Sequence, residues 1–160
     1  MPEQKKLAVL DIQSLKTIDH IALPGRPSRL ALHPDERLLW IGQTGDKEEE
    51  SAVDIFDTVS GKIVAHLSLP QGHHEFAFSS DGRYAYATSR QAGTITVIDA
   101  ITLTKIKDIT VGPQPIAAVF ITQEQNLWVI EAQEGRIHRY DQEGNALDVL
   151  TIESGLGRQN

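Results

Sequence analysis

The sequence predicts an all-β fold that is built from repeated four-stranded sheets. An aspartate follows a short, mostly apolar run four times, with spacings of 46, 42 and 42 residues, at Asp11, Asp57, Asp99 and Asp141. The runs between these aspartates are four to eight residues long, rich in Val, Ile, Thr and aromatics, and bounded by Gly, Pro or polar turns, as strands are. No window has the sustained spacing of an amphipathic helix. Four short antiparallel strands in about 42 residues are typical of one β-propeller blade.

The elements follow in a fixed order in each copy, and we letter them A to D. The A runs lie at 30–35, 76–81 and 118–123. The B runs each carry an aromatic residue, Trp40, Tyr86 or Trp128, which we expect to pack between neighbouring blades. The C runs end at the repeated aspartates, whose carboxylates suit the following turns. The D runs lie at 18–23, 63–69, 106–111 and 147–152, and Gly and Pro follow the first three.

We expect residues 1–160 to form a single partial β-propeller domain. It would contain a half-blade at 7–23 and complete blades at 28–69, 75–111 and 116–152. The total of about 14 strands is half of a seven-bladed ring, whereas propellers usually close with about four to eight blades. Three explanations stay open: a piece of a larger propeller, a complementary half supplied by a partner, and association with another copy of the chain.

Composition excludes several classes of function. The chain has 15 Lys and Arg against 22 Asp and Glu, a formal charge of −7, so it lacks the basic balance of a nucleic-acid-binding domain. With no Cys it has neither disulfides nor Cys-ligated zinc. No apolar run approaches the ~20 residues of a membrane span. The apolar stretch at the start is too short for a secretory leader, which leaves two compartments open: periplasmic or otherwise extracytoplasmic if a leader was removed, and cytoplasmic otherwise.

The middle repeat carries a family resemblance. Residues 76–89, FAFSSDGRYAYATS, followed by GTITVID at 93–99, closely resemble the YVTN-type β-propeller repeat, whose name-giving tetrapeptide aligns with 86–89. The sequence VGPQP at 111–115 resembles the turn between blades in that family. The outer copies depart from the tetrapeptide at Trp40 and Trp128 but keep the strand pattern. The resemblance implies a bladed ring, often in extracytoplasmic bacterial proteins, and no single activity, because relatives include sugar lactonases, d1-haem proteins and plain binding scaffolds.

Candidate ligand-binding residues gather in loops that the meander places at one end of its sheets. These are the D–A and B–C loops, and their candidates are Arg26, Arg29, His73, His74 and Glu75. A histidine of the pair could hold haem or a metal, although adjacent strand residues point to opposite faces, so at most one would reach the axis. We favour a turn-capping and a solvated role for the pair. The arginines could hold an anionic ligand, but surface ion pairs are the commoner role.

An acidic insert accounts for the longer first spacing. Four extra residues lie between Asp35 and Asp57, and we expect them within 46–50. The weak metal candidates there are Asp46, Glu48, Glu49 and Glu50. Calcium prefers several oxygen ligands, but the insert lacks the spacing of a calcium loop, and we favour a solvated hairpin tip.

No catalytic motif accompanies the repeats. The sequence has no nucleophile elbow, phosphate-binding glycine loop or zinc-protease motif. We therefore predict a non-catalytic binding scaffold that acts through protein or ligand contacts on the D–A/B–C loop face, with no cofactor. The alternative is part of a propeller enzyme or cofactor carrier of the lactonase or d1-haem kind, with haem or a divalent metal.

Overall fold

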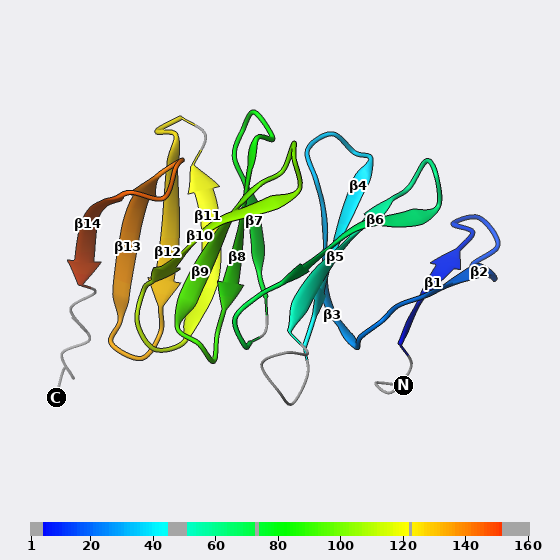
Figure 1. The fold of residues 1–160 in the computed structure, drawn as a ribbon, viewed down its shortest axis with the longest axis horizontal. Coiled ribbons are helices and arrows are strands. Elements are labelled where there is room, and N and C mark those ends of the chain that lie inside the picture. The colour runs from blue at the N-terminus through cyan, green and yellow to red at the C-terminus, as the bar shows by residue number, and fades with distance from the viewer. Residues whose placement is uncertain (1–4, 45–50, 73, 122, 152–160) are drawn as a thin grey trace, which may run out of the picture. The chain divides into compact units, whose positions relative to one another are not determined.

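The computed structural model describes residues 5–44, 51–72, 74–121 and 123–151. Within these ranges the chain forms 14 β-strands and no helix, and every paired strand is antiparallel to its neighbour. The strands make one two-stranded sheet and three four-stranded sheets, each a simple meander (Figure 1). The described residues include no helix of the length and hydropathy that crossing a membrane requires. The predicted all-β class and strand number are confirmed.

The sheets follow one another along the chain. The first contains β1 (Lys6–Leu10) and β2 (Thr17–Ala22). The second contains β3 (Pro27–Leu32), β4 (Leu38–Gln43), β5 (Ala52–Asp57) and β6 (Lys62–Ser68). The third contains β7 (Phe76–Phe78), β8 (Tyr84–Ser89), β9 (Thr94–Asp99) and β10 (Thr104–Thr110). The fourth contains β11 (Pro115–Ile121), β12 (Asn126–Glu131), β13 (Arg136–Asp141) and β14 (Ala146–Thr151).

The chain divides into two compact units, residues 1–74 and 75–160. In the first unit the two-stranded sheet packs on one face of the β3–β6 sheet. Leu23, Ile41 and Phe56 form its buried cluster, and Leu7 and Ile21 pack against them. The strand register explains why this cluster forms on one face, because Ile41 and Phe56 lie on the same face of the four-stranded sheet. That a single domain spans the chain stays a prediction.

The second unit contains two four-stranded sheets that share one core. Tyr86 and Val97 of the β7–β10 sheet belong to the same buried cluster as Leu127 and Val129 of the β11–β14 sheet. The Tyr86 ring stacks on the Phe120 ring, with centroids 5.9 Å apart and planes at 9°. The predicted packing of this aromatic between neighbouring sheets is therefore confirmed. At the equivalent positions Trp40 is fully buried, whereas Trp128 is only half-buried.

The repeated aspartates close the turns between C and D strands. The Asp99 carboxylate accepts hydrogen bonds from the backbone N–H groups of Ile101 and Thr102, at 2.9 and 2.8 Å. The same pattern recurs at the other turns, where Asp11, Asp57 and Asp141 accept from backbone N–H groups two to four residues later. Each carboxylate is thus used by its own turn, which is the structural role that the sequence predicts.

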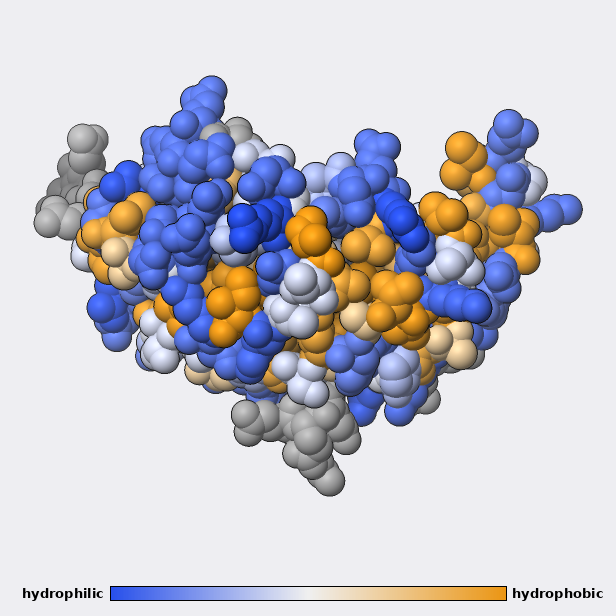
Figure 2. All heavy atoms as spheres, turned by 45° about the horizontal axis from the view of Figure 1, so that its top comes forward, coloured by the Kyte–Doolittle hydropathy of each residue, from blue (hydrophilic) through white to orange (hydrophobic). Residues whose placement is uncertain are grey.

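Many exposed apolar side chains lie singly among polar ones. Figure 2 shows apolar and polar side chains interspersed over the visible face. Several of the most exposed apolar residues, Ile12, Val59 and Ile101, lie in the turns that the aspartates close. Single exposed apolar residues are normal on folded proteins, so these turns do not by themselves mark a binding surface.

Candidate functional site

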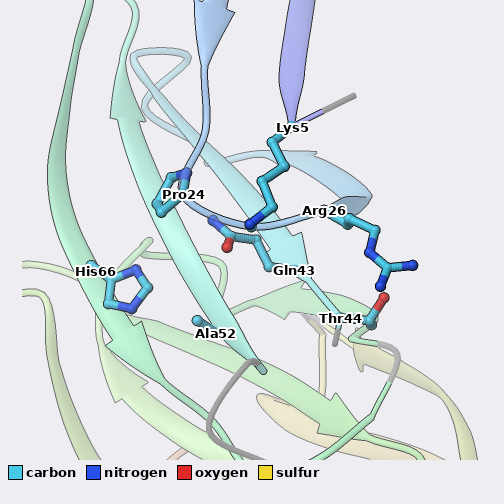
Figure 3. A pocket seen from close by; sticks show the side chains of 8 residues that line it. Lys5, Pro24, Arg26, Gln43, Thr44, Ala52 and His66 are labelled. Carbon is cyan, nitrogen blue, oxygen red and sulfur yellow. The ribbon is translucent and has the colours of Figure 1, made fainter. Parts of the chain in front are cut away.

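A pocket of about 320 Å³ lies in the first unit, where the loop ends of its two sheets meet (Figure 3). It is lined by Lys5, Pro24, Gly25, Arg26, Gln43, Thr44, Ala52 and His66. Its volume is at the lower end of the range of small-molecule sites, about 300–1,000 Å³. It opens at the end of the β3–β6 sheet that carries the D–A and B–C connections, which is the end where the sequence predicts ligand contacts.

Strand register brings these residues together. Gln43 ends β4 and pairs with Ala52, which begins β5. Two residues further along β5, Asp54 pairs with His66 of β6. Side chains two residues apart share a face of a sheet, so Gln43, Asp54 and His66 lie on the face that packs against β1 and β2. The pocket is the polar end of the same layer whose apolar centre contains Ile41 and Phe56.

A buried carboxylate, which does not itself line the pocket, holds two of the lining residues from beneath, and we call Gln43 and Asp54 the floor. Asp54 is fully buried. His66 Nδ1 lies 2.6 Å from Asp54 Oδ1, and Gln43 Nε2 donates to Asp54 Oδ2. A carboxylate can only accept, so the ring hydrogen of neutral His66 belongs on Nδ1 and the Gln43 amide nitrogen faces Asp54. Both carboxylate oxygens are engaged, and the His66 atom left for a ligand is Nε2.

Backbone contacts place the two cationic side chains at the rim. The Lys5 carbonyl accepts from the N–H of Leu23 at 2.8 Å, which holds the start of the chain beside the turn after β2. The Arg26 carbonyl accepts from the N–H of Thr44 at 3.2 Å, which ties that turn to the end of β4. In Figure 3 Lys5 extends over the pocket toward Gln43, and Arg26 extends toward Thr44.

Gly25 permits the close approach of this turn to the floor. A Cβ atom there would overlap the Gln43 amide, lying 2.9 Å from Cδ and nearer still to Oε1. Gln43 is buried and held by Asp54, so it has little room to move away. The glycine therefore has a steric role at the pocket.

The structure places one of the predicted ligand-binding residues at the pocket and others away from it. Arg26 lines the pocket, whereas Arg29 is an exposed residue of β3 that does not line it. His74 is fully buried, and the Glu75 N–H donates to Thr88 Oγ1 at 3.0 Å. The remaining nominated residues, His73, Asp46, Glu48, Glu49 and Glu50, lie outside the described residues. Their roles stay predictions.

Sequence reasoning missed the other polar members of the site, which are Lys5, Gln43, Thr44, Asp54 and His66. A signal existed, because the last residue of every B strand is a buried polar residue: Gln43, Ser89 and Glu131. The position of Asp54 is also polar in each copy, at Thr96 and His138. Thr96 Oγ1 donates to Asp108 Oδ1 at 2.6 Å, a C-to-D pair that repeats the Asp54–His66 pair. A search for polar residues that recur at the repeat spacing would have found the positions of Gln43 and Asp54.

The third copy of the Asp54 position, occupied by His138, differs from the first two. His138 faces Val149 across the strands, and its buried Nε2 has no hydrogen-bond partner. Burial, followed by the nearby Arg136 charge, lowers the pKa of His138, so it favours the neutral ring. The described residues contain no group of three or more His, Asp or Glu side chains placed to bind a metal ion.

The structural comparisons place this architecture among β-propellers. The chain is similar to Kuenenia stuttgartiensis hydrazine synthase, with a TM-score of 0.68 and 18% identity over 79% of this chain and 36% of that one. It is similar to dihydro-heme d1 dehydrogenase NirN in complex with DHE, with a TM-score of 0.74 and 16% identity over 94% of this chain and 34% of that one. It is also similar to the RRP9 WD40 repeats, with a TM-score of 0.65 and 15% identity over 78% of this chain and 38% of that one.

These likenesses support the fold alone. The chain spans between 34 and 38% of the length of these three solved chains, which is consistent with a partial propeller. The neighbours include a dehydrogenase and a WD40 protein, so the shared architecture accompanies different functions. No protein-family profile and no curated protein sequence matches the chain.

Proposed function

We propose that this chain is a non-catalytic binding module built from YVTN-type propeller repeats, and that it binds a ligand at the D–A/B–C end of its first four-stranded sheet. The observation that carries the proposal is the pocket itself, with its buried floor of Gln43 and Asp54 beside the more exposed His66. At the opposite end of the sheets the aspartates are used by their own turns. Polar groups facing a concave site are typical of ligand binding.

A ligand screen with two matched variants tests the proposal. The full chain is screened by saturation-transfer NMR against sugars, nucleotides, carboxylates, phosphates and amines. Thr44→Trp adds bulk at the pocket, and Ile101→Trp adds the same bulk at an exposed turn in the second unit. We expect a saturable ligand whose signal is lost in Thr44→Trp, kept in Ile101→Trp, and whose chemical structure is unchanged after incubation.

Two results would contradict the proposal. One is that no compound binds, or that every bound compound is insensitive to Thr44→Trp while the variant keeps the wild-type fold. The other is that a compound is converted, which would favour the enzyme alternative.

The alternative is a cofactor carrier or enzyme. The observation that favours it is the likeness to a dehydrogenase solved with DHE. The candidate ligand His74 is fully buried, so its described position offers no ring atom at the surface for a haem or a metal. Titration with haem and with divalent metals, using His73→Ala/His74→Ala as the control, separates this alternative from a plain binding module.

Association completes the proposed function. We propose that another copy of the chain, or a complementary propeller half, packs on the outer face of the β11–β14 sheet. Val119, Ile130 and Leu150 share this face and are exposed, and Trp128 beside them is half-buried. Light scattering tests self-association. A molar mass of two chains at micromolar concentration supports it. A molar mass of one chain, unchanged as the protein concentration is raised, contradicts it.

A further inference from the structure

A histidine lies in the core that the two sheets of the second unit share. His138 of β13 is 8% exposed, and its ring stacks on the Tyr140 ring, with centroids 6.4 Å apart and planes at 9°. It pairs with Val129 of β12, which places it on the face of the β11–β14 sheet that carries the shared cluster. The ring Nε2 is buried and has no hydrogen-bond partner. A titratable group is therefore held between two sheets without the partner that buried polar groups normally have.

The repeat shows what the partner is in the other copies. Asp54 of the first copy faces His66 of the adjacent D strand, and Thr96 of the second copy faces Asp108. A hydrogen bond joins each of these pairs. In the third copy the D-strand residue is Val149, whose side chain has neither a donor nor an acceptor. The histidine thus occupies a position where the repeat otherwise supplies a polar neighbour.

The charged groups on the same sheet are engaged with one another. Arg136 Nε donates to Glu131 Oε2 at 3.1 Å, and Arg136 also pairs with Glu134, whose N–H donates to Glu131 Oε1 at 2.9 Å. Among the described residues, no ion pair includes the His138 ring. Tyr140 stays neutral because burial raises the pKa of its phenol. β11 contains no charged residue, and the single charged residue of β14 lies on the opposite face of the sheet.

The strands of the facing β7–β10 sheet place four titratable side chains on the shared face, Tyr84, Tyr86, Asp99 and Lys107. The Tyr86 hydroxyl donates to a backbone carbonyl at 2.6 Å, and Lys107 Nζ donates to a side chain of the next C–D turn at 3.3 Å. The Asp99 carboxylate accepts from N–H groups of its own turn. The one carboxylate that these strands place on the face is therefore held by its turn.

We propose that His138 makes the packing of the β11–β14 sheet on the β7–β10 sheet sensitive to acid, because protonation puts a charge into the shared core and favours separation of the two sheets. A neutral ring tolerates burial, whereas a charged one requires a partner. Burial, followed by the Arg136 charge, lowers the pKa of the ring, and Glu131 opposes this only in part. The inference concerns the second unit and does not rest on the proposed ligand binding.

The sign of the pH dependence follows from proton linkage. Above the ordinary His pKa of about 6.5 the ring is neutral in the folded and the unfolded chain, so the packing is complete. As the pH falls below this value, the unfolded chain takes up the proton more readily. The equilibrium constant for unfolding should then rise by up to about tenfold per pH unit, until the folded ring is itself protonated.

Urea unfolding of the full chain at pH 7, 6 and 5 tests the proposal. Methyl NMR signals of Val97 and Val129 report on the two sheets that share the core. His138→Phe keeps a ring against Tyr140 and cannot be protonated, so it should lose this part of the acid sensitivity. His20→Phe removes an exposed histidine of β2 and should keep the pH dependence of the wild type.

A second pair of variants restores the polar neighbour. Val149 is half exposed, so Val149→Asp places a carboxylate beside the ring at little cost in packing. A nearby opposite charge favours the protonated ring, so we expect the unfolding constant no longer to rise from pH 7 to pH 5. Val149→Asn has the same size without the charge and should remain acid-sensitive. NMR titration of the His138 ring should show half-protonation at a higher pH in Val149→Asp than in the wild type.

Three results would overturn the proposal. The first is a His138→Phe variant that unfolds with the pH dependence of the wild type. The second is a wild-type His138 ring that is half-protonated at or above about pH 6.5. The third is equal acid sensitivity in Val149→Asp and Val149→Asn. If His138→Phe does not fold, the wild-type ring titration and the Val149 pair decide the question.

Discussion

The Tyr86 hydroxyl of one four-stranded sheet donates to the Gln142 carbonyl of the next sheet, at 2.6 Å. Its ring also stacks on Phe120, and burial raises the pKa of the phenol, so the hydroxyl keeps its proton at any physiological pH. One side chain thus supplies both apolar contact and a directional bond between the two sheets of the second unit.

Replacement of Tyr86 separates these two contributions. Tyr86→Phe keeps the ring and leaves the Gln142 carbonyl without this donor, so we expect a loss of about 1 kcal/mol in the free energy of unfolding. Tyr86→Ala also removes the buried ring and should cost about 3–5 kcal/mol. Urea unfolding followed by circular dichroism measures both. Equal losses in the two variants would mean that the ring does not bridge the sheets.

Two glycines provide a matched test of sheet packing. Gly144 and Gly61 both have positive φ, 77° and 69°. A Cβ at Gly144 would lie 2.6 Å from Ile109 Cδ1 and 2.9 Å from Val97 Cγ2, whereas one at Gly61 would meet nothing within 4 Å. Gly61→Ala should therefore cost only the backbone strain of about 1–2 kcal/mol. Gly144→Ala should cost about 1–3 kcal/mol more, from overpacking. Thermal unfolding of the pair measures the difference, and similar losses would contradict the packing described.

An ion pair in the first unit predicts a pH dependence. Arg37 Nε and Nη2 donate to the Asp57 carboxylate at 3.0 and 2.7 Å. The Arg37 guanidinium lowers the pKa of Asp57 far below its usual range, and backbone N–H groups of the turn lower it further. Because the unfolded chain binds this proton more readily, the stabilisation is fully present above the ordinary Asp pKa of about 3.9 and is lost as the pH falls toward the folded value.

Comparison of the wild type with Asp57→Asn measures this contribution. The difference in unfolding free energy should be largest above about pH 5 and should shrink below about pH 4. Arg37→Gln should reduce the same pH dependence, because it removes the largest cause of the lowered pKa. A difference that is constant from pH 3 to pH 7 would contradict the ion pair.

The pocket floor predicts an uncommon histidine tautomer. His66 Nδ1 lies against the buried Asp54 carboxylate, so the neutral ring should carry its hydrogen on Nδ1. Long-range nitrogen–proton NMR correlations distinguish the two tautomers directly. In Asp54→Ala, checked for native folding by its amide spectrum, the ring should lose this preference. A neutral wild-type ring with its hydrogen on Nε2 would contradict the described floor.

Sequence reasoning predicted the fold better than the site. The sheets follow from local patterns that repeat: the apolar runs, and the turn aspartates such as Asp99, which need only neighbouring N–H groups. The short β7, only Phe76–Phe78, shows where the pattern is less informative, since the A run of that copy extends to Asp81 in the sequence.

The pocket depends on contacts that a local pattern does not contain. Arg26 was a candidate because it lies in a loop at the predicted end of the sheets. Lys5 and His66 join it only because β1 and β2 pack on one face of the β3–β6 sheet, which brings together residues about 60 positions apart in the chain. The buried polar position shared by Gln43 and Glu131 was present in the repeat, but its burial becomes evident only when the sheets are stacked.

The pocket exists because the two-stranded sheet packs against the β3–β6 sheet. Nuclear Overhauser spectroscopy on methyl-labelled protein measures this packing most directly. We predict cross-peaks that join the Ile41 methyl groups and the Phe56 ring to methyl groups of Leu7, Ile21 and Leu23. A well-dispersed spectrum in which β1 and β2 pair with each other but give no cross-peaks to Ile41 or Phe56 would contradict the fold, and the binding site with it.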